Sequence, residues 1–226
     1  MNKPYWIFLF IIILATCLLG HALQNQWINY ISKPLIILSL GGYFLSQTAP
    51  AKSALKKWVL VALFFSWAGD VLLLFEGKDQ LFFLLGLSAF LIAHLCYIVF
   101  FHQLRLKENV RGRIWLLVIV VVYYATLISF LSPWLGDMKI PVRIYGLVIN
   151  FMFMLAMHML FIKNKTAGRW MMTGALLFLI SDSVLAVNKF CQPFAVADLT
   201  IILTYGLAQL FIAEGAIRYL TLPHKG

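Results

Sequence analysis

Three long stretches of this chain contain no charged residue, and this feature limits the fold more than any other. The stretches cover residues 80–104, 114–136 and 144–162. Each is close to the roughly 20 residues that a helix needs to cross the hydrocarbon core of a bilayer. Hydrophobic residues make up 63% of the chain and charged residues 12%, whereas a soluble domain has about half and about a quarter. The sequence therefore predicts an all-α integral membrane protein.

Glycine, proline, charge clusters and aromatic residues at the water boundary divide the chain into eight spans. We expect them near residues 5–23, 29–47, 54–75, 81–102, 114–135, 141–162, 169–188 and 198–220. The second is the weakest, because Gly41, Gly42 and the polar end at Ser46 and Gln47 shorten it, so a bundle of seven helices is the alternative. The connections are too short for a soluble domain, the longest being expected around 105–113, and residues 1–226 are expected to form a single transmembrane domain.

The distribution of basic residues favours eight spans and gives an orientation. With eight spans, 13 of the 18 Lys and Arg residues, from Lys3 to Lys225, lie on one side of the membrane. The other side holds Lys33, Lys78, Lys139, Arg143 and Lys189. Basic loops stay in the cytoplasm, so both termini are predicted to be cytoplasmic. The net charge of +10 then reflects membrane orientation and contact with membrane lipids, and no nucleic acid partner is expected.

Two predicted spans each contain a single aspartate, Asp70 in 54–75 and Asp182 in 169–188. A charged side chain in a span costs roughly 2.5–3.5 kcal/mol on insertion scales, so it normally has a partner or a function. Both helices run outward and place their aspartate about 8 Å from the non-cytoplasmic boundary, at about 1.5 Å per residue. We therefore expect both side chains to line one cavity on that side.

Two interpretations of these aspartates stay open at this point. Each side chain could simply hold neighbouring helices together through hydrogen bonds, with Lys189 as a counter-ion for Asp182. Alternatively, the two could form a functional pair with one protonated and one ionised carboxyl group, the usual arrangement for general acid and base catalysis.

An internal similarity suggests that the two aspartates occupy equivalent positions. GLSAFLIAH at 86–94 and GLAQLFIAE at 206–214 share Gly, Leu, Ile and Ala at the same spacing, and the span before each segment carries one aspartate. Both pairs of spans cross the membrane in the same direction. A parallel repeat of four plus four helices is therefore a further hypothesis.

Other polar side chains within or near the spans are less specific. We treat them as candidate substrate-binding residues: His94, Tyr97, Asn150, Asn188, Lys189, Tyr205 and Gln209. Asn150 begins a stripe that continues to Met154 and His158, and helix contacts alone would explain such residues equally well. Glu214 and Arg218 have the spacing of a local ion pair. No metal-ligand spacing accompanies His94 and the three cysteines are scattered, so no metal, cofactor or disulfide is expected.

Four blocks of the sequence together resemble the YhhN-like lysoplasmalogenase family. The blocks are AGDVLLLF at 68–75, GLSAFLIAHLCYIVFF at 86–101, SDSVLAVNKF at 181–190 and TYGLAQLFIAEG at 204–215. The resemblance implies a membrane hydrolase that cleaves the vinyl ether bond of lysoplasmalogens to a fatty aldehyde and glycerophosphoethanolamine or glycerophosphocholine. It also implies that the family's essential carboxylates fall on Asp70 and Asp182.

Vinyl ether hydrolysis suits a pair of carboxyl groups. Protonation of the β carbon gives an oxocarbenium ion that water captures, as in two-carboxylate glycoside hydrolysis. We expect the lysophospholipid to enter from the non-cytoplasmic leaflet of a bacterial inner membrane. A small lipid or ion-coupled transporter is the alternative, because intramembrane carboxylates also bind coupling ions. A transporter predicts broken helices, whereas the two aspartate-bearing spans contain no proline. A receptor or scaffold, the third class, would not need paired acids at one depth.

Overall fold

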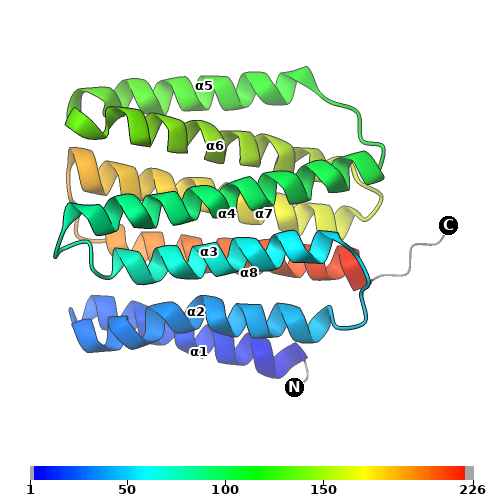
Figure 1. The fold of residues 1–226 in the computed structure, drawn as a ribbon, viewed down its shortest axis with the longest axis horizontal. Coiled ribbons are helices and arrows are strands. Elements are labelled where there is room, and N and C mark those ends of the chain that lie inside the picture. Colours follow the sequence, from blue (N-terminus) through cyan, green and yellow to red (C-terminus); the bar gives the residue numbers. More distant parts are fainter. Residues whose placement is uncertain (1–2, 222–226) are drawn as a thin grey trace.

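Eight α-helices run side by side along the long axis of the molecule (Figure 1) in the computed structural model, which describes residues 3–221. They are α1 (Lys3–Ala22), α2 (Gln26–Gln47), α3 (Leu55–Leu73), α4 (Gln80–Lys107), α5 (Ile114–Leu131), α6 (Lys139–His158), α7 (Lys165–Ala186) and α8 (Ala197–Thr221). Short 3-10 turns cover Ser132–Trp134, Gly136–Met138 and Met159–Phe161, and a π-helical turn, η4, covers Val187–Cys191. The described residues contain no strand, so the all-α prediction is confirmed, and each predicted span coincides with one helix.

Seven helical segments of the described chain are long and apolar enough to cross a bilayer. The predicted weak second span is among them, since α2 continues for 22 residues through Gly41 and Gly42. The exception is α3, because Lys56, Lys57 and Asp70 interrupt its apolar sequence. The seven-helix alternative expected α2 to be the weak span, whereas the helix outside the set of seven is α3. Because α3 lies between α2 and α4 along the bundle (Figure 1), it belongs to the same set of eight.

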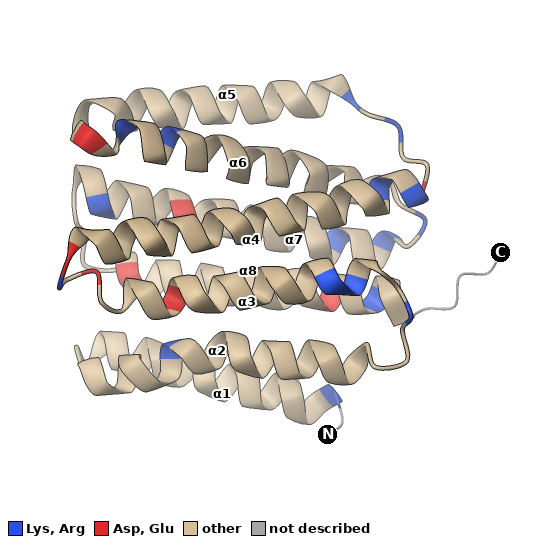
Figure 2. Cartoon of the chain, viewed as in Figure 1, with Lys and Arg blue, Asp and Glu red and all other residues tan. Residues whose placement is uncertain are grey.

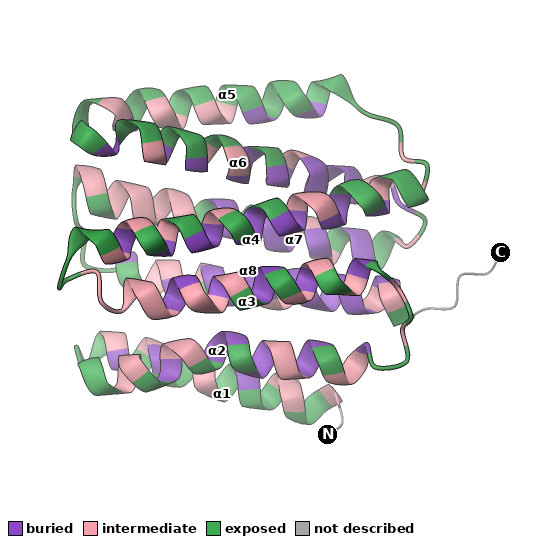
Figure 3. Ribbon diagram, viewed as in Figure 1, coloured by how far each residue is buried: buried purple, intermediate pink, exposed green. Residues whose placement is uncertain are grey.

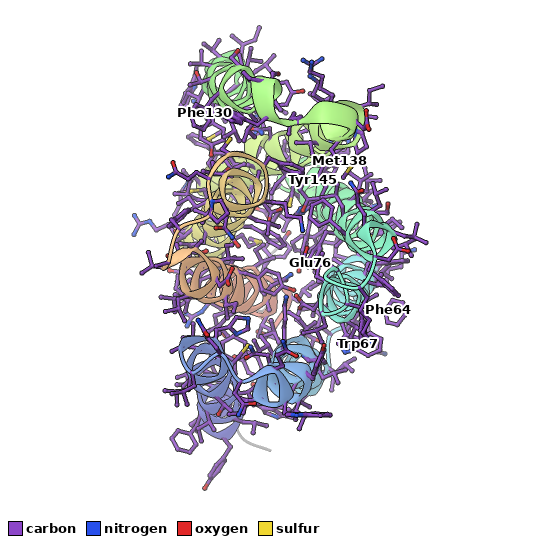
Figure 4. The ribbon with its side chains drawn as sticks, turned by 90° about the vertical axis from the view of Figure 1, so that its left-hand side faces the viewer. Phe64, Trp67, Glu76, Phe130, Met138 and Tyr145 are labelled. Carbon is purple, nitrogen blue, oxygen red and sulfur yellow. The ribbon has the colours of Figure 1, made fainter. Side chains whose placement is uncertain are left out.

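The helices form two layers, which are seen end-on in Figure 4. One layer has the order α2, α3, α4 and α6, and the other has the order α1, α8 and α7, with α5 against α6 at one edge. The pairs α3 with α4 and α7 with α8 make the most extensive contacts. The start of α1 and the end of α8 lie at the same end of the bundle (Figure 1). We call this end of the bundle the terminal end and the opposite end the distal end. The cytoplasmic placement of the termini stays a prediction. Lys225, one of the basic residues behind it, lies outside the described residues.

Side-chain caps and charge clusters set where the helices begin and end. The side chain of Asn25 accepts from the backbone N–H groups of Trp27 and Ile28 at the start of α2, and Asp79 and Asn164 cap α4 and α7 in the same way. Most Lys and Arg residues lie near the two ends of the bundle (Figure 2). Helix α4 continues to Lys107, so the loop before α5 is shorter than the sequence suggested.

Helices α7 and α8 approach each other closely at Gly174. A Cβ atom on Gly174 of α7 would lie 2.7 Å from the backbone oxygen of Ala208 and 2.7 Å from the backbone nitrogen of Ile212 on α8. Small residues at such crossings allow membrane helices to approach closely, where packing provides the attraction that the hydrophobic effect does not. The outer helix faces are exposed (Figure 3), and on α5 they carry Ile119 and Val122 at 46% and 60% exposure. These apolar faces suit contact with lipid tails.

A buried ion cluster joins three helices toward the terminal end. Glu214 of α8, 4% exposed, accepts hydrogen bonds from Arg218 at 2.6 Å and from Tyr43 of α2 at 2.6 Å. Lys3 of α1 also forms an ion pair with Glu214. The predicted local pair of Glu214 and Arg218 is confirmed, and the structure adds partners from α1 and α2 that sequence spacing does not reveal.

Candidate active site

A cavity of about 540 Å³ opens at the distal end of the bundle and contains both aspartates on its wall. Residues from α1, α2, α3, α4, α6, α7 and α8 line it, together with the α3–α4 loop. Asp70 lies in the last turn of α3 and Asp182 lies about one turn before the end of α7. Figure 4 looks onto this end and shows Glu76 and Tyr145 near the space between the layers, whereas Phe64 and Trp67 project outward.

Asp70 is bound by one tyrosine from the opposite layer. It is 2% exposed, and the hydroxyl group of Tyr205 on α8 donates to its Oδ2 atom at 2.7 Å. The preceding Gly69 allows the ring of Phe90 to pack against the α3 backbone, because a Cβ atom there would lie 2.6 Å from that ring. Phe90 in turn meets the Tyr205 ring edge-on at 5.7 Å between centroids. The Ala-Gly-Asp sequence thus places a carboxyl group and an aromatic contact together.

Asp182 has two polar partners. The hydroxyl group of Tyr145 on α6 donates a short hydrogen bond to its Oδ2 atom, and the Nε2 atom of His94 on α4 lies 3.3 Å from the same oxygen. That nitrogen is also 2.9 Å from the Tyr145 hydroxyl oxygen. Because the Tyr145 hydroxyl donates its hydrogen bond to Asp182, its oxygen can accept one, and the geometry assigns the His94 ring proton to Nε2. Its Nδ1 atom is buried with no hydrogen-bond partner among residues 3–221.

An aromatic ring connects the hydrogen-bond partners of the two carboxyl groups. The Phe178 ring on α7 contacts His94 at 4.7 Å and Tyr205 at 5.4 Å between centroids. Asp70 and Asp182 therefore belong to two hydrogen-bonded groups that share one apolar support. The side chain of Asp182 is 13% exposed, so the two carboxyl groups differ both in burial and in their number of donors. Different surroundings are what an acid and base pair requires.

Tyr97 and Gln209 lie behind the cavity wall. The Tyr97 hydroxyl donates to the Gln209 side-chain oxygen at 2.7 Å, and the Gln209 amide donates to Ser66 at 2.9 Å. Ser66 is one helical turn before Asp70, and Gln209 is one turn after Tyr205. This buried network joins α4, α8 and α3 beneath the first carboxyl group. Tyr97 and Gln209 therefore pack beneath the cavity wall and do not line the cavity. His94 does not line it either, although it contacts Asp182, which does.

Tyr205 lines the main cavity, whereas Asn150, Asn188 and Lys189 lie away from it. Asn150 donates to the backbone of Gly146 in its own helix and faces a separate space of about 30 Å³ between α5, α6 and α7. Asn188 accepts from the backbone nitrogen of Phe194 in the loop after η4. Lys189 forms an ion pair with Glu76 at 3.0 Å. The suggestion that Lys189 is the counter-ion of Asp182 is therefore wrong, because its carboxylate partner comes from the α3–α4 loop.

Tyr145 and Lys33 line the cavity but are not among the candidates that the sequence suggests. Tyr145 carries no local signal, since its partner Asp182 is on another helix. Lys33 lies within the predicted span 29–47 and counts there only among the basic residues of the non-cytoplasmic side; in the structure it lies inside α2 and lines the cavity. Its signal is present in the sequence: Gln26, Asn29, Tyr30 and Lys33 follow helical spacing, and all four line the cavity. Within residues 3–221 no group of three His, Cys, Asp or Glu side chains is arranged to hold a metal ion.

The fold and site define a multi-pass membrane protein with two intramembrane carboxyl groups on one cavity. The model of the YhhN family matches residues 28–216, and the chain belongs to this family. Human lysoplasmalogenase TMEM86B is 34% identical over 198 residues, covering 86% of this chain and 78% of the relative. Lysoplasmalogenase TMEM86A from Bos taurus is 31% identical over 202 residues, covering 85% and 79%.

A bacterial relative is similar over a shorter region. Lysoplasmalogenase from Mycobacterium bovis is 32% identical over 163 residues, covering 71% of this chain and 60% of the relative. No solved structure matches the chain. The sequence blocks that resemble the family lie mainly on α3, α4, α7 and α8. All four helices contribute residues to the cavity wall.

Proposed function

We propose that this protein is a lysoplasmalogenase, which hydrolyses the sn-1 vinyl ether bond of an alkenyl glycerophospholipid to a fatty aldehyde and the glycerophospho head group. The observation that carries the proposal is the presence of Asp70 and Asp182, from two different helices, on one cavity. The relatives named lysoplasmalogenase support the same reaction. A cavity of about 540 Å³ has the size of a small-molecule site.

The reaction needs an acid and a base. One carboxyl group donates a proton to the β carbon of the vinyl ether, which leaves an oxocarbenium ion on the adjacent carbon. The other carboxylate stabilises this cation and takes a proton from the attacking water. The hemiacetal hydroxyl then returns a proton to the first carboxylate while its carbon–oxygen bond to glycerol breaks, and the second carboxyl group protonates the leaving glycerol oxygen. One water molecule is consumed, and both carboxyl groups return to their starting states.

The neighbouring tyrosines and histidine support this chemistry. Tyr205 orients Asp70, while Tyr145 and His94 orient Asp182. Fixed hydrogen-bond donors in an apolar site stabilise charge without reorganisation during the reaction. Phe90 and Phe178 provide the apolar surroundings next to both groups. The cavity opens at the distal end, which the basic-residue distribution places on the non-cytoplasmic side, so the substrate enters from that leaflet of a bacterial inner membrane.

The test is aldehyde release by purified protein and three matched carboxylate variants. We expect Asp70→Asn and Asp182→Asn each to lower kcat by about 10²- to 10⁴-fold, the usual contribution of a general acid or base. Asp198→Asn is the control, because Asp198 lines the same cavity but is exposed at the start of α8. Wild-type turnover in either of the first two variants, correctly inserted, would refute the mechanism. Transport of intact lipid without aldehyde release would favour the transporter alternative.

A further inference from the structure

The cavity has two chemically different walls. Its α2 wall is polar and consists of Gln26, Asn29, Tyr30 and Lys33. Its α4 wall is apolar and consists of Phe83, Leu87 and Phe90. The carboxyl groups of Asp70 and Asp182 come from α3 and α7, which also line the cavity. A ligand with a polar part, an apolar part and a reactive bond at their junction would match this arrangement.

Lys33 is the most unusual residue of the polar wall. It lies well inside α2, with the exposed apolar residues Ile31 and Leu35 on either side along the chain. None of the four ion pairs among residues 3–221 includes Lys33. A cation inside a membrane helix is costly without a partner, and it commonly marks the path of a substrate. Lys33 lines the cavity, so an anionic group of a bound ligand can be that partner.

Asn29, one turn before Lys33, offers a second donor. Its side-chain oxygen is buried without a hydrogen-bond partner among the described residues. That oxygen lies against Gly20 of α1, where a Cβ atom would approach it to 2.3 Å. An amide group that turns its oxygen toward α1 turns its nitrogen away from α1. Asn29 also lines the cavity, so its amide nitrogen and the Lys33 ammonium group form a cationic and donor-rich wall.

We propose that Lys33, assisted by Asn29, binds the phosphodiester of the lysophospholipid, an assignment that rests on the proposed function. Lysine binds phosphate as a compact point charge. In a lysoplasmalogen the glycerol backbone lies between the phosphodiester and the vinyl ether. In the cavity, helix α3 with Asp70 lies between α2 and α4. The alkenyl chain then lies along Phe83, Leu87 and Phe90. Lys33 makes the protein select phosphorylated alkenyl lipids over uncharged alkenylglycerols.

The first experiment compares two substrates in phosphate-free detergent. Aldehyde release is measured from alkenyl glycerophosphoethanolamine and from the corresponding alkenylglycerol, which lacks the phosphate. For Lys33→Met we expect the ratio of kcat/KM values, phosphorylated over unphosphorylated, to fall about 10- to 100-fold, the effect of losing a hydrogen bond to a charged group. Lys33→Arg should restore most of the preference. Lys52→Met, a lysine from the other end of the bundle, should keep the wild-type ratio. An unchanged ratio in Lys33→Met would overturn the proposal, because Lys33 would then serve both substrates equally, as a counter-ion of Asp70 would.

The second experiment measures binding without turnover. A saturated 1-O-alkyl glycerophosphoethanolamine has no vinyl ether to cleave, and it should raise the thermal unfolding midpoint of the wild type but not of Lys33→Met. Inorganic phosphate at the same concentration should give a smaller shift, and an equal shift would overturn the lipid assignment. If the wild type released no aldehyde, the proposed function would fail, yet lipid stabilisation that depends on Lys33 would still support the phosphate site. Equal stabilisation of both proteins would overturn it.

Discussion

Replacement of Tyr145 by phenylalanine removes one oxygen atom from the candidate active site. That oxygen donates to Asp182 and lies 2.9 Å from the Nε2 atom of His94. The aromatic ring, which meets the His94 ring edge-on at 5.3 Å between centroids, is kept. Tyr145→Phe therefore tests the hydrogen bond to Asp182 while it preserves the packing of α6 against α4.

The expected size of the effect follows from the charge of the acceptor. A hydrogen bond to a charged group contributes about 1.5–3 kcal/mol, whereas a bond between neutral groups contributes about 0.5–1.5 kcal/mol. If the bond orients and stabilises the Asp182 carboxylate during the reaction, its loss lowers kcat by about 10- to 150-fold. KM should change less than about twofold, because the proposed head-group contacts lie on α2.

Tyr123→Phe is a closely matched control. The Tyr123 hydroxyl on α5 makes a 2.8 Å hydrogen bond with Ser183, the residue after Asp182 on α7. This variant also removes a tyrosine hydroxyl that binds a side chain of α7, but it leaves the hydrogen bonds of Asp182 untouched. We expect kcat within about twofold of the wild type, since only a bond between neutral groups is lost.

Steady-state aldehyde release, which gives kcat and KM, is measured together with the thermal unfolding midpoint to distinguish an effect on catalysis from an effect on stability. Tyr145→Phe should lose turnover at a temperature where both variants are fully folded. Equal kcat values for Tyr145→Phe and Tyr123→Phe would refute the reasoning, because the bond to Asp182 would then have no role beyond that of an ordinary helix contact.

Three further predictions concern packing and topology. Gly174→Ala should destabilise the protein by about 1–3 kcal/mol, measured by thermal unfolding, because its Cβ atom would meet the backbone of α8; an unchanged midpoint would contradict this contact. Tyr97→Phe should lower stability by about 1–3 kcal/mol with little change in KM, since Gln209 loses its buried donor; a large rise in KM would instead place Tyr97 in substrate binding. Gly77→Cys should react with an impermeant thiol reagent from outside intact cells and Lys52→Cys should not, and the reverse pattern would invert the predicted orientation.

The sequence is sufficient to predict the helices and to identify the two intramembrane carboxyl groups. In a bilayer core, water cannot satisfy backbone N–H and C=O groups, so a long apolar segment must form a helix. Charges inside such a segment are costly, and this cost alone singles out Asp70 and Asp182 in the sequence. The same reasoning applies to Lys33, which lies within the predicted span 29–47 but counts there only as a basic residue of the non-cytoplasmic side.

The side chains around the carboxyl groups could not be ranked from the sequence. The sequence offers no reason to rank His94, Tyr97 and Gln209 as substrate-binding candidates. In the structure His94 contacts Asp182, whereas Tyr97 binds Gln209 and Gln209 binds Ser66. Asn150 and Tyr145 share α6 and both line a small space beside α5 and α7, but only Tyr145 also lines the main cavity. Helical periodicity defines which residues share a face, but the neighbour of that face depends on how the helices pack.

The sequence by itself determines that Asp70 and Asp182 lie in apolar helices, each near one end of its helix. Their cost in such a helix can be recognised without knowing the neighbouring helices. Their meeting on one cavity, the different partners of each carboxyl group and the position of Lys33 on the polar wall are decided by the tertiary structure. The physical reason is that close packing, such as the contact of Gly174 with α8, sets the helix positions, and hydrogen bonds between helices depend on atoms that are distant in the sequence.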